Sequence, residues 1–247
     1  MLSYIDTHCH LDLFQDIKKS VKIEDELPIK TITVTNAPFI WRHNELLFRN
    51  CHNIRPALGL HPQLAVQHLH EIELFKTLSR DVKYIGEIGL DGSINHKGTR
   101  IEQLKIFQQI INALVGLDKK ILTIHSRNAA EKTTTELKTA LRNTNHQVIM
   151  HWFSGTPVEL NLAIKEDFYF SINHKMIYSK KGNEIIKNIP ADKILTETDA
   201  PFTFDDKIIN RQQSLNLTIQ GLASLWNMSY QEAKSKVYLN FKNLLNR

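Results

Sequence analysis

Short apolar runs alternate with longer amphipathic stretches along the whole chain. The runs have the length of strands and are rich in Ile, Val, Thr, Phe and Tyr, whereas the stretches between them repeat apolar residues at helical spacing. Eight such units in 247 residues predict a (β/α)8 TIM-type barrel. An open dinucleotide-binding sheet is disfavoured, because no G-x-G-x-x-G fingerprint follows the first run. The expected strands are Ser3–His8, Lys30–Thr35, Ile54–Gly59, Lys83–Glu87, Lys120–His125, Gln147–His151, Phe168–Ile172 and Lys193–Glu197.

The composition suits a single domain over residues 1–247. Hydrophobic residues make up 42% of the chain, enough for one large core, and there is no linker or low-complexity segment. Cys9 and Cys51 are expected to be free thiols in a reducing compartment. The sequence has neither a secretory leader nor a long apolar run, so we expect a cytoplasmic protein without membrane contact. The net charge of +5 permits a phosphate-bearing substrate without demanding one.

Three expected helix starts carry the residues of a capping box. In this motif a Ser or Thr and a Glu three positions later satisfy each other's free backbone N–H groups. The clearest helical pattern, Thr99–Leu117, begins with one of them. The expected pairs are Thr99 with Glu102, Thr156 with Glu159, and Ser229 with Glu232.

His8 and His10 end the first expected strand with one residue between them. Side chains two apart on a strand share a face, so both imidazoles can reach one metal ion. With 12 histidines in the chain, this spacing arises by chance about once. His68 and His70 have the same spacing but begin a helical pattern, in which side chains two apart point about 200° from each other. We therefore expect those two to be surface residues that do not share an ion.

Four more side chains of metal-ligand type end or follow other expected strands. Glu87 ends the fourth, His125 the fifth and His151 the sixth, and Asp199 follows the eighth. The carboxyl ends of barrel strands form one rim, where barrel enzymes place their catalytic groups. A carboxylate or imidazole at the end of an apolar strand is costly to bury unless it is paired or bound to metal. The set therefore predicts a metal centre on this rim.

Four imidazoles and two carboxylates are too many for one tetrahedral zinc and suit two divalent ions. Glu87 is the expected bridge, because it lies mid-barrel and has two oxygens. Asp199 is expected to orient the attacking water and accept its proton. The ligand chemistry leaves Zn²⁺, Mn²⁺ and Mg²⁺ open. The expected ligand sets are His8, His10, Glu87 and Asp199 for one ion, and Glu87, His125 and His151 for the other.

Six blocks in this order resemble the TatD-type DNase family over nearly the whole chain. The resemblance implies a metal-dependent deoxyribonuclease of amidohydrolase-like barrel fold, often an exonuclease acting from the 3′ end, with DNA as substrate. The segment GLHPQLA and the turn GLDGS are most similar to the TatD-like nuclease of bacterial Qat anti-phage systems. This resemblance implies partners from a defence operon. The blocks are Ile5–Asp12, Gly59–Pro62, Ile85–Asp91, Ile124–Ala129, His151–Gly155 and Glu197–Phe202.

The chain departs from the family pattern at three places, all of which bear on substrate choice. Gly92-Ser93 follows GLD where relatives commonly have tyrosines, and Trp152 replaces the usual cysteine after the strand-six histidine. The segment Ile208–Asn216 only weakly resembles the usual arginine-asparagine-proline stretch. The expected metal ligands are all retained.

Other residues on the same rim are candidates for substrate binding. The resemblance makes His61, in GLHP, a phosphate-contacting residue. Arg127 either holds a substrate phosphate with its two-pronged guanidinium or pairs with Glu197. Trp152 and Phe153 either stack on a base of a single strand or pack against the barrel. Asp91 is expected to be a turn or supporting acceptor rather than a ligand.

Two other functions remain open at this point. A barrel hydrolase acting on an amide, lactone or aminoacyl ester would use the same metal pair to polarise a carbonyl. Many such sites bridge their ions with a carboxylated lysine on the fourth strand, where this chain has Glu87. A weakly active or non-catalytic partner subunit of a defence complex would keep the site for structure, but such a site tolerates the loss of ligands and this one is complete.

Overall fold

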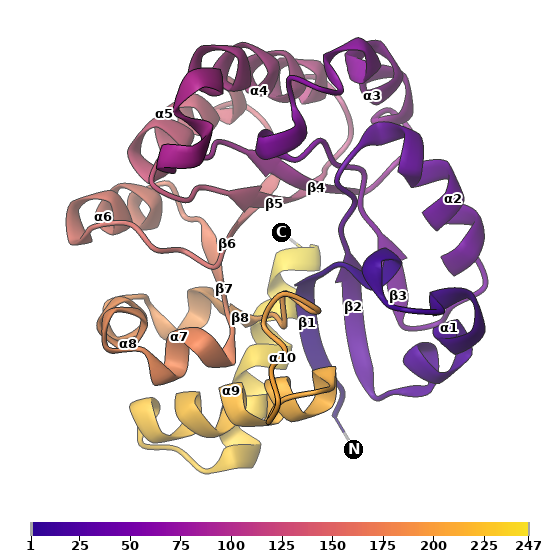
Figure 1. Cartoon of the computed structure of the whole chain (residues 1–247). Coiled ribbons are helices and arrows are strands. Elements are labelled where there is room, and N and C mark those ends of the chain that lie inside the picture. Colours follow the sequence, from indigo (N-terminus) through magenta and orange to yellow (C-terminus); the bar gives the residue numbers. More distant parts are fainter. Residues whose placement is uncertain (1, 247) are drawn as a thin grey trace.

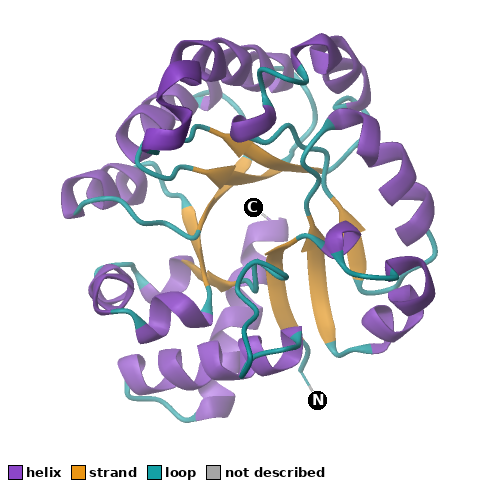
Figure 2. Cartoon of the chain, in the orientation of Figure 1, coloured by secondary structure: helices purple, strands orange, loops and turns teal. Residues whose placement is uncertain are grey.

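Parallel strands form a ring at the centre of the protein, and helices surround it (Figures 1 and 2). The computed structural model describes residues 2–246. Strands β1–β2–β3 form one parallel sheet and β4–β5–β6–β7–β8 another. A bridge between Leu58 and Ile85 joins the sheets on one side, and β1 meets β8 on the other. The architecture is the expected (β/α)8 TIM-type barrel. The strands are β1 (Tyr4–Cys9), β2 (Ile29–Thr33), β3 (Ile54–Pro56), β4 (Tyr84–Gly89), β5 (Ile121–His125), β6 (Gln147–His151), β7 (Tyr169–Ile172) and β8 (Ile194–Thr196).

The helices cover the outer face of the ring. Their apolar sides pack against the strands and form the core with them. None of the helices within residues 2–246 is long and apolar enough to cross a membrane. The α-helices are α1 (Ile17–Glu26), α2 (Pro38–Phe48), α3 (Ile72–Leu78), α4 (Arg100–Leu114), α5 (Ala130–Leu141), α6 (Pro157–Lys165), α7 (His174–Tyr178), α8 (Lys180–Lys187), α9 (Arg211–Trp226) and α10 (Tyr230–Asn246).

Every predicted strand overlaps an observed one, and β3 differs most from expectation. It ends at Pro56 rather than Gly59, after which the chain makes only the bridge at Leu58. Gly59 allows an unusually close approach of the backbones here. A Cβ at this position would lie 2.0 Å from the carbonyl oxygen of Thr35 and 2.4 Å from the amide of Glu87. The glycine therefore lets this connection pack directly beside the residue expected to bridge the ions.

Two of the three predicted capping boxes are confirmed and one is wrong. Thr156 and Glu159 cap each other reciprocally at the start of α6, and Ser229 and Glu232 do the same before α10. Thr99 makes no side-chain cap bond at the start of α4. The residues before it form a 3₁₀ helix, Ile94–Thr99, and the Thr99 hydroxyl donates instead to the carbonyl of an earlier residue in that helix.

A buried polar network fixes the loop after β8 to β1. The guanidinium of Arg211 is fully buried and donates to the Asp6 carboxylate at 2.9 Å. That carboxylate also accepts from the backbone amide and the hydroxyl of Thr198, at 2.9 and 2.7 Å. The amide of Asp199 in turn donates to the carbonyl of His8 at 2.8 Å. The network therefore holds Asp199 against the end of the first strand.

Candidate metal centre

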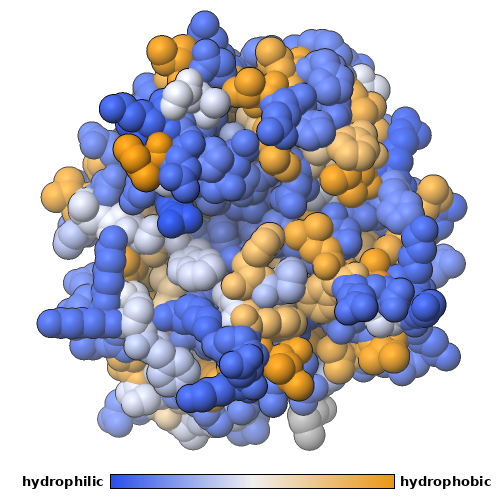
Figure 3. All heavy atoms as spheres, in the orientation of Figure 1, coloured by the Kyte–Doolittle hydropathy of each residue, from blue (hydrophilic) through white to orange (hydrophobic). Residues whose placement is uncertain are grey.

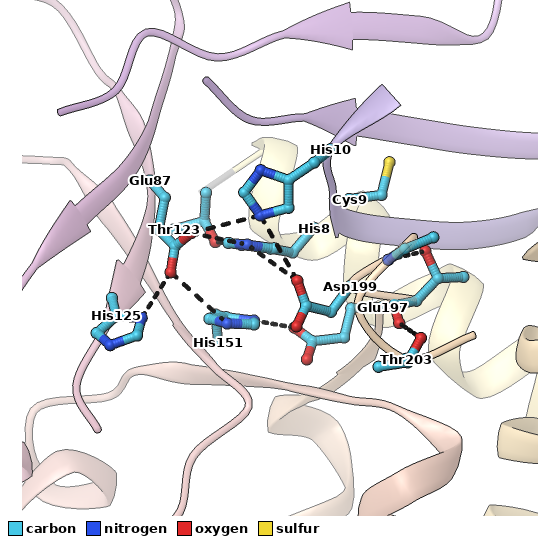
Figure 4. Close-up of polar contacts among 12 residues, drawn as sticks. His8, Cys9, His10, Glu87, Thr123, His125, His151, Glu197, Asp199 and Thr203 are labelled. Atoms are coloured by element: carbon cyan, nitrogen blue, oxygen red, sulfur yellow. Dashed lines mark hydrogen bonds and ion pairs between the residues drawn. The ribbon is translucent and has the colours of Figure 1, made fainter. Parts of the chain in front are cut away.

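The carboxyl ends of the strands open into a pocket of about 580 Å³, visible as a hollow near the middle of the face shown in Figure 3. Strands β1, β4, β5 and β6 each direct a histidine or glutamate toward it (Figure 4). His8 lies beneath the pocket floor and is fully buried. The structure therefore brings all six predicted ligand residues to one place. Those lining the pocket are His10, Glu87, His125, His151 and Asp199.

Glu87 lies at the centre and presents its two oxygens to different imidazoles. Its Oε2 lies 3.4 Å from His8 Nε2 and 3.5 Å from His10 Nε2. Its Oε1 lies 2.7 Å from His125 Nδ1 and 3.7 Å from His151 Nε2. One carboxylate thus faces two separate groups of nitrogens, which is the arrangement that a bridging ligand requires.

Asp199 closes the first of these groups. Its Oδ1 lies 3.8 Å from His8 Nε2 and 3.6 Å from His10 Nε2. His8 Nε2 is fully buried and has no hydrogen-bond partner, although its other nitrogen lies 2.7 Å from the hydroxyl of Thr123. A buried nitrogen without a partner is costly, and here it points between two carboxylates.

These distances test whether the residues suit a metal ion. Separations of 3.4 to 3.8 Å are long for hydrogen bonds. Two ligand atoms on one tetrahedral ion, with bonds of about 2.1 Å, lie about 3.4 Å apart. Three sets of three residues here have ligand atoms within 4.8 Å of one another: His8, His10 and Glu87; His61, Glu87 and His125; and His8, His151 and Asp199. The donor set and its spacing therefore fit divalent ions.

Two histidines of the second group are held by carboxylates on their far side. His151 Nδ1 lies 2.9 Å from Glu197, which itself accepts from Ser171 and Asn173. His125 Nε2 lies 2.9 Å from Asp91 Oδ2. Such partners fix the orientation of a metal-binding imidazole and raise its basicity.

Burial and charge set the protonation of the centre. Burial, together with the charge of His151, lowers the pKa of His8 to about 4, so its imidazole is neutral at pH 7. Burial alone would raise the pKa of Glu87, but His61, His8 and the hydrogen bond with His125 hold it well below its usual range. Burial opposes the charged form of His151 as well, yet Glu197 raises its pKa to about 10.

His61 lies deeper than its position in a loop motif suggested. Its Nε2 is 3.5 Å from Glu87 Oε2, as close as that of His10, and burial lowers its pKa. One ligand atom each of His61, Glu87 and His125 lies within 4.8 Å of the other two. Its other nitrogen accepts a hydrogen bond from the amide of Gln63. His61 therefore faces the same space as the predicted ligands.

Three expectations about the rim have different outcomes. Arg127 is exposed on the pocket wall and its guanidinium has no hydrogen-bond or ion-pair partner among the described residues, so the expected alternative of a pair with Glu197 is wrong. His151 takes that carboxylate instead. Trp152 lines the pocket, whereas Phe153 is buried against Phe170 and packs in the core.

Two pocket residues have left-handed backbone conformations, Trp152 with φ 36° and Asp199 with φ 50°. An aspartate tolerates this region, but a bulky residue such as tryptophan adopts it rarely and at a cost of about 1–3 kcal/mol. Such outliers persist where the surrounding structure enforces them, and they cluster at functional sites. The turn after β6 therefore sets the position of the Trp152 side chain on the pocket wall.

Known proteins share the sequence pattern and the fold of this chain. The family model described as TatD related DNase matches residues 5–246. The chain belongs to the TatD family. It is 29% identical over 252 residues to the metal-dependent hydrolase YabD of Bacillus subtilis, covering 97% of each chain. It is 24% identical over 250 residues to the human deoxyribonuclease TATDN3, covering 92% of this chain and 89% of that one. The TatD homologue YJJV of Escherichia coli has the same fold, with a TM-score of 0.84, 22% identity and full coverage of both chains.

Like YabD, this TatD protein is a metal-dependent hydrolase. Sequence reasoning missed two of the residues that orient its imidazoles, Thr123 behind His8 and Glu197 behind His151. A signal for each was present, because both lie two positions before an expected ligand, on β5 and after β8. Asp91 behaves as expected, since it accepts a hydrogen bond from the turn amide of Ser93.

Proposed function

We propose that this protein is a metal-dependent deoxyribonuclease, in which one domain spanning the chain hydrolyses phosphodiester bonds at the ends of single-stranded DNA. The observation that carries the proposal is the position of Glu87, with one oxygen facing His8 and His10 and the other facing His125 and His151. A pair of ions bridged by a carboxylate is the usual device for displacement at phosphorus. The name of the human relative, deoxyribonuclease TATDN3, supports the choice of DNA.

The residues proposed to hold the ions form the two groups around Glu87. Zn²⁺, Mn²⁺ and Mg²⁺ all remain candidates. Two such ions, when bound, lower the pKa of a water molecule and neutralise charge on the phosphoryl oxygens. The proposed sets are His8, His10, Glu87 and Asp199 for one ion, and Glu87, His125 and His151 for the other.

The side chains of this protein have distinct proposed tasks around that pair. Burial alone would raise the pKa of Asp199, but the facing imidazoles of His10, His151 and His8 lower it, so the carboxylate is ionised and can accept a proton. Arg127 is exposed at the pocket wall with its guanidinium unpaired, ready to hold a phosphate. His61 contacts a phosphate oxygen from inside the pocket. Trp152 offers a ring face to a base.

The shape of the site favours a single strand over a duplex. A pocket of about 580 Å³ is of the size that accepts a small molecule or the end of a flexible chain. A base pair inside a duplex cannot reach its floor, because enzymes that act on buried groups of DNA must first extract them from the stack. We therefore propose exonucleolytic action on single-stranded or frayed ends.

The resemblance of the GLHPQLA and GLDGS segments to the Qat nuclease supports a role in anti-phage defence in the cytoplasm, with partners from the same operon. Such a role requires an active nuclease or a partner subunit that retains the centre. The retention of all six candidate ligands favours the active enzyme.

The proposal is tested with end-labelled DNA and a panel of other substrates. Single-stranded DNA, blunt duplex DNA, aminoacyl-tRNA and lactones are incubated with the purified protein in Mg²⁺, Mn²⁺ or Zn²⁺. We expect shortening of the single strand and little cutting of the duplex, with only a shallow dependence on salt, because few phosphates are contacted. Cleavage of an ester or lactone without cleavage of DNA under any metal overturns the nuclease assignment and leaves the hydrolase fold intact.

A further inference from the structure

A second cluster of metal-ligand side chains lies outside the pocket, in the connection between β3 and α3. His68 Nδ1 lies 2.7 Å from Glu71 Oε1, and His70 Nε2 lies 3.7 Å from the same oxygen. One ligand atom from each of the three residues lies within 4.8 Å of the others. The cluster shares no residue with the groups around Glu87.

The local backbone explains how these side chains meet. His68 immediately precedes a 3₁₀ helix, Leu69–Glu71. With three residues per turn, side chains three apart lie one above the other, so His68 and Glu71 align. Side chains two apart are separated by about 120° in a 3₁₀ helix, against about 160° in an α-helix, where the rotation is 200°. The expectation that His68 and His70 cannot share an ion is therefore not supported, because it assumed an α-helix and overlooked the glutamate. His70 is exposed as expected, but His68 is half-buried.

The Glu71 carboxylate gives an independent reason to expect a cation. It is buried, with 7% of the residue exposed. Its Oε2 accepts a hydrogen bond from the backbone amide of Phe39 at 2.8 Å. Its Oε1 is hydrogen-bonded to His68 Nδ1 and faces His70 Nε2, and no lysine or arginine of the described residues pairs with it. A buried carboxylate without a lysine or arginine partner favours a cation beside it, and the two imidazoles supply further ligands for one.

We propose that His68, His70 and Glu71 form a third divalent-metal site, which takes Zn²⁺ with a water molecule as the fourth ligand. Two imidazoles and one carboxylate are a donor set typical of zinc, with one position left open. Mg²⁺ prefers oxygen ligands and is not expected to occupy it. The His70 side chain is 74% exposed and free to rotate, so it can shorten its distance to the ion.

The position of the site gives it a structural consequence. Glu71 already links the first turn of α2, through Phe39, to the turn before α3, and these two helices are neighbours in the ring (Figure 1). The β3–α3 connection that holds His68 and His70 also contains His61, whose amide donates to the carbonyl of Asn36 in the β2–α2 connection. An ion at this site therefore clamps two loops of the catalytic face without touching the pocket.

The site is tested by titrating metal-stripped protein with Zn²⁺ in a calorimeter. The test variant is His70→Ala, whose exposed side chain can be removed without disturbing the core. His52→Ala is the matched control, since His52 is also exposed and belongs to no group of ligands among the described residues. We expect His70→Ala to bind about one ion fewer than the wild type and than the control, and Mg²⁺ titrations to be the same for all three.

Two further measurements keep the proposal independent of the nuclease assignment. In a protein with His125→Ala and His151→Ala, the ion that depends on His70 should still bind. Zn²⁺ should also raise the melting temperature of that protein, and adding His70→Ala or Glu71→Gln should reduce the rise. Equal stoichiometry and affinity for Zn²⁺ in the wild type and in His70→Ala overturn the third site. Failure to cleave DNA has no bearing on these binding measurements.

Discussion

The two His-x-His motifs of this chain have the same spacing and opposite surroundings. His8 and His10 stand at the end of a strand, where both side chains enter the barrel and are almost completely buried. His68 and His70 flank the start of a 3₁₀ turn at the protein surface. Each pair faces a buried glutamate, Glu87 in the first case and Glu71 in the second. The difference teaches that the spacing alone says little, whereas the secondary structure and the depth decide what an imidazole pair can do.

Depth changes the chemistry of the nitrogens in the first motif. The imidazole of His8 is excluded from water, which lowers its pKa to about 4 and leaves Nε2 without a hydrogen-bond partner. A neutral nitrogen fixed in place by Thr123 needs no reorganisation before it binds an ion. The exposed imidazole of His70 is free to rotate and must lose that freedom on binding. We therefore expect tight binding in the barrel and weaker binding on the surface.

The largest effect is expected from changing the two glutamates in parallel. Glu87→Gln keeps the size of the side chain but removes its charge and one strong acceptor, so both ions of the catalytic pair should weaken. We expect turnover to fall by roughly 1000-fold or more, since the metal pair supplies several kcal/mol of stabilisation to the transition state. Glu71→Gln should leave turnover within about a factor of two, because it touches neither pocket nor substrate. Near-wild-type turnover in Glu87→Gln would falsify the two-metal mechanism.

The second largest effect is expected from removing both histidine ligands of one catalytic ion. His125→Ala combined with His151→Ala should lose one ion and retain the other on His8, His10 and Asp199. Elemental analysis measures the metal content, and a His70→Ala background removes the contribution of the surface site. Circular dichroism checks that the barrel is folded, as expected because the apolar strands carry the fold. Full occupancy of both catalytic positions in this protein would contradict the ligand assignment.

The sequence predicted what depends on local pattern. Each strand was found from its run of apolar residues, and the ligands were found because each ends or follows a strand of a barrel whose carboxyl ends meet. It did not predict the partners of the imidazoles, since Thr123 and His8 are 115 residues apart and meet only through barrel closure. The 3₁₀ turn at Leu69–Glu71 was also missed, because over so few residues its pattern is the same as that of a helix start.

A third, smaller effect is expected at the pocket wall. Arg127→Ala should reduce kcat/KM for single-stranded DNA by roughly 10- to 100-fold, the loss of one charge-assisted contact to phosphate, with metal content unchanged. His61→Ala should likewise weaken substrate use without emptying the centre. Steady-state kinetics and elemental analysis on the same samples separate the two roles. Loss of an ion from His61→Ala would instead identify His61 as a ligand, since its Nε2 lies 3.5 Å from Glu87 Oε2.

The smallest effect concerns protons rather than turnover. The nearby Glu197 carboxylate raises the pKa of His151 to about 10 despite burial, so in metal-free protein the imidazole is protonated at pH 7. An ion binds only the neutral ring, and binding must therefore release this proton and become stronger as the pH rises toward 10. Glu197→Gln removes the charge that raises this pKa, so the variant should release fewer protons at pH 7 and show a weaker dependence of affinity on pH.

Calorimetry of Zn²⁺ binding in buffers with different ionisation enthalpies counts the released protons directly. The imidazole also loses basicity in Glu197→Gln, so we expect its intrinsic affinity for metal to fall about tenfold, measured near pH 10 where proton competition is small. His70→Ala is the control, because it removes a site far from His151 and should leave the proton count of the catalytic pair unchanged. If Glu197→Gln releases as many protons as the wild type, the charge on His151 does not come from Glu197. The source would then be the other carboxylates near the ring, Asp199 and Glu87, because burial by itself lowers the pKa of His151.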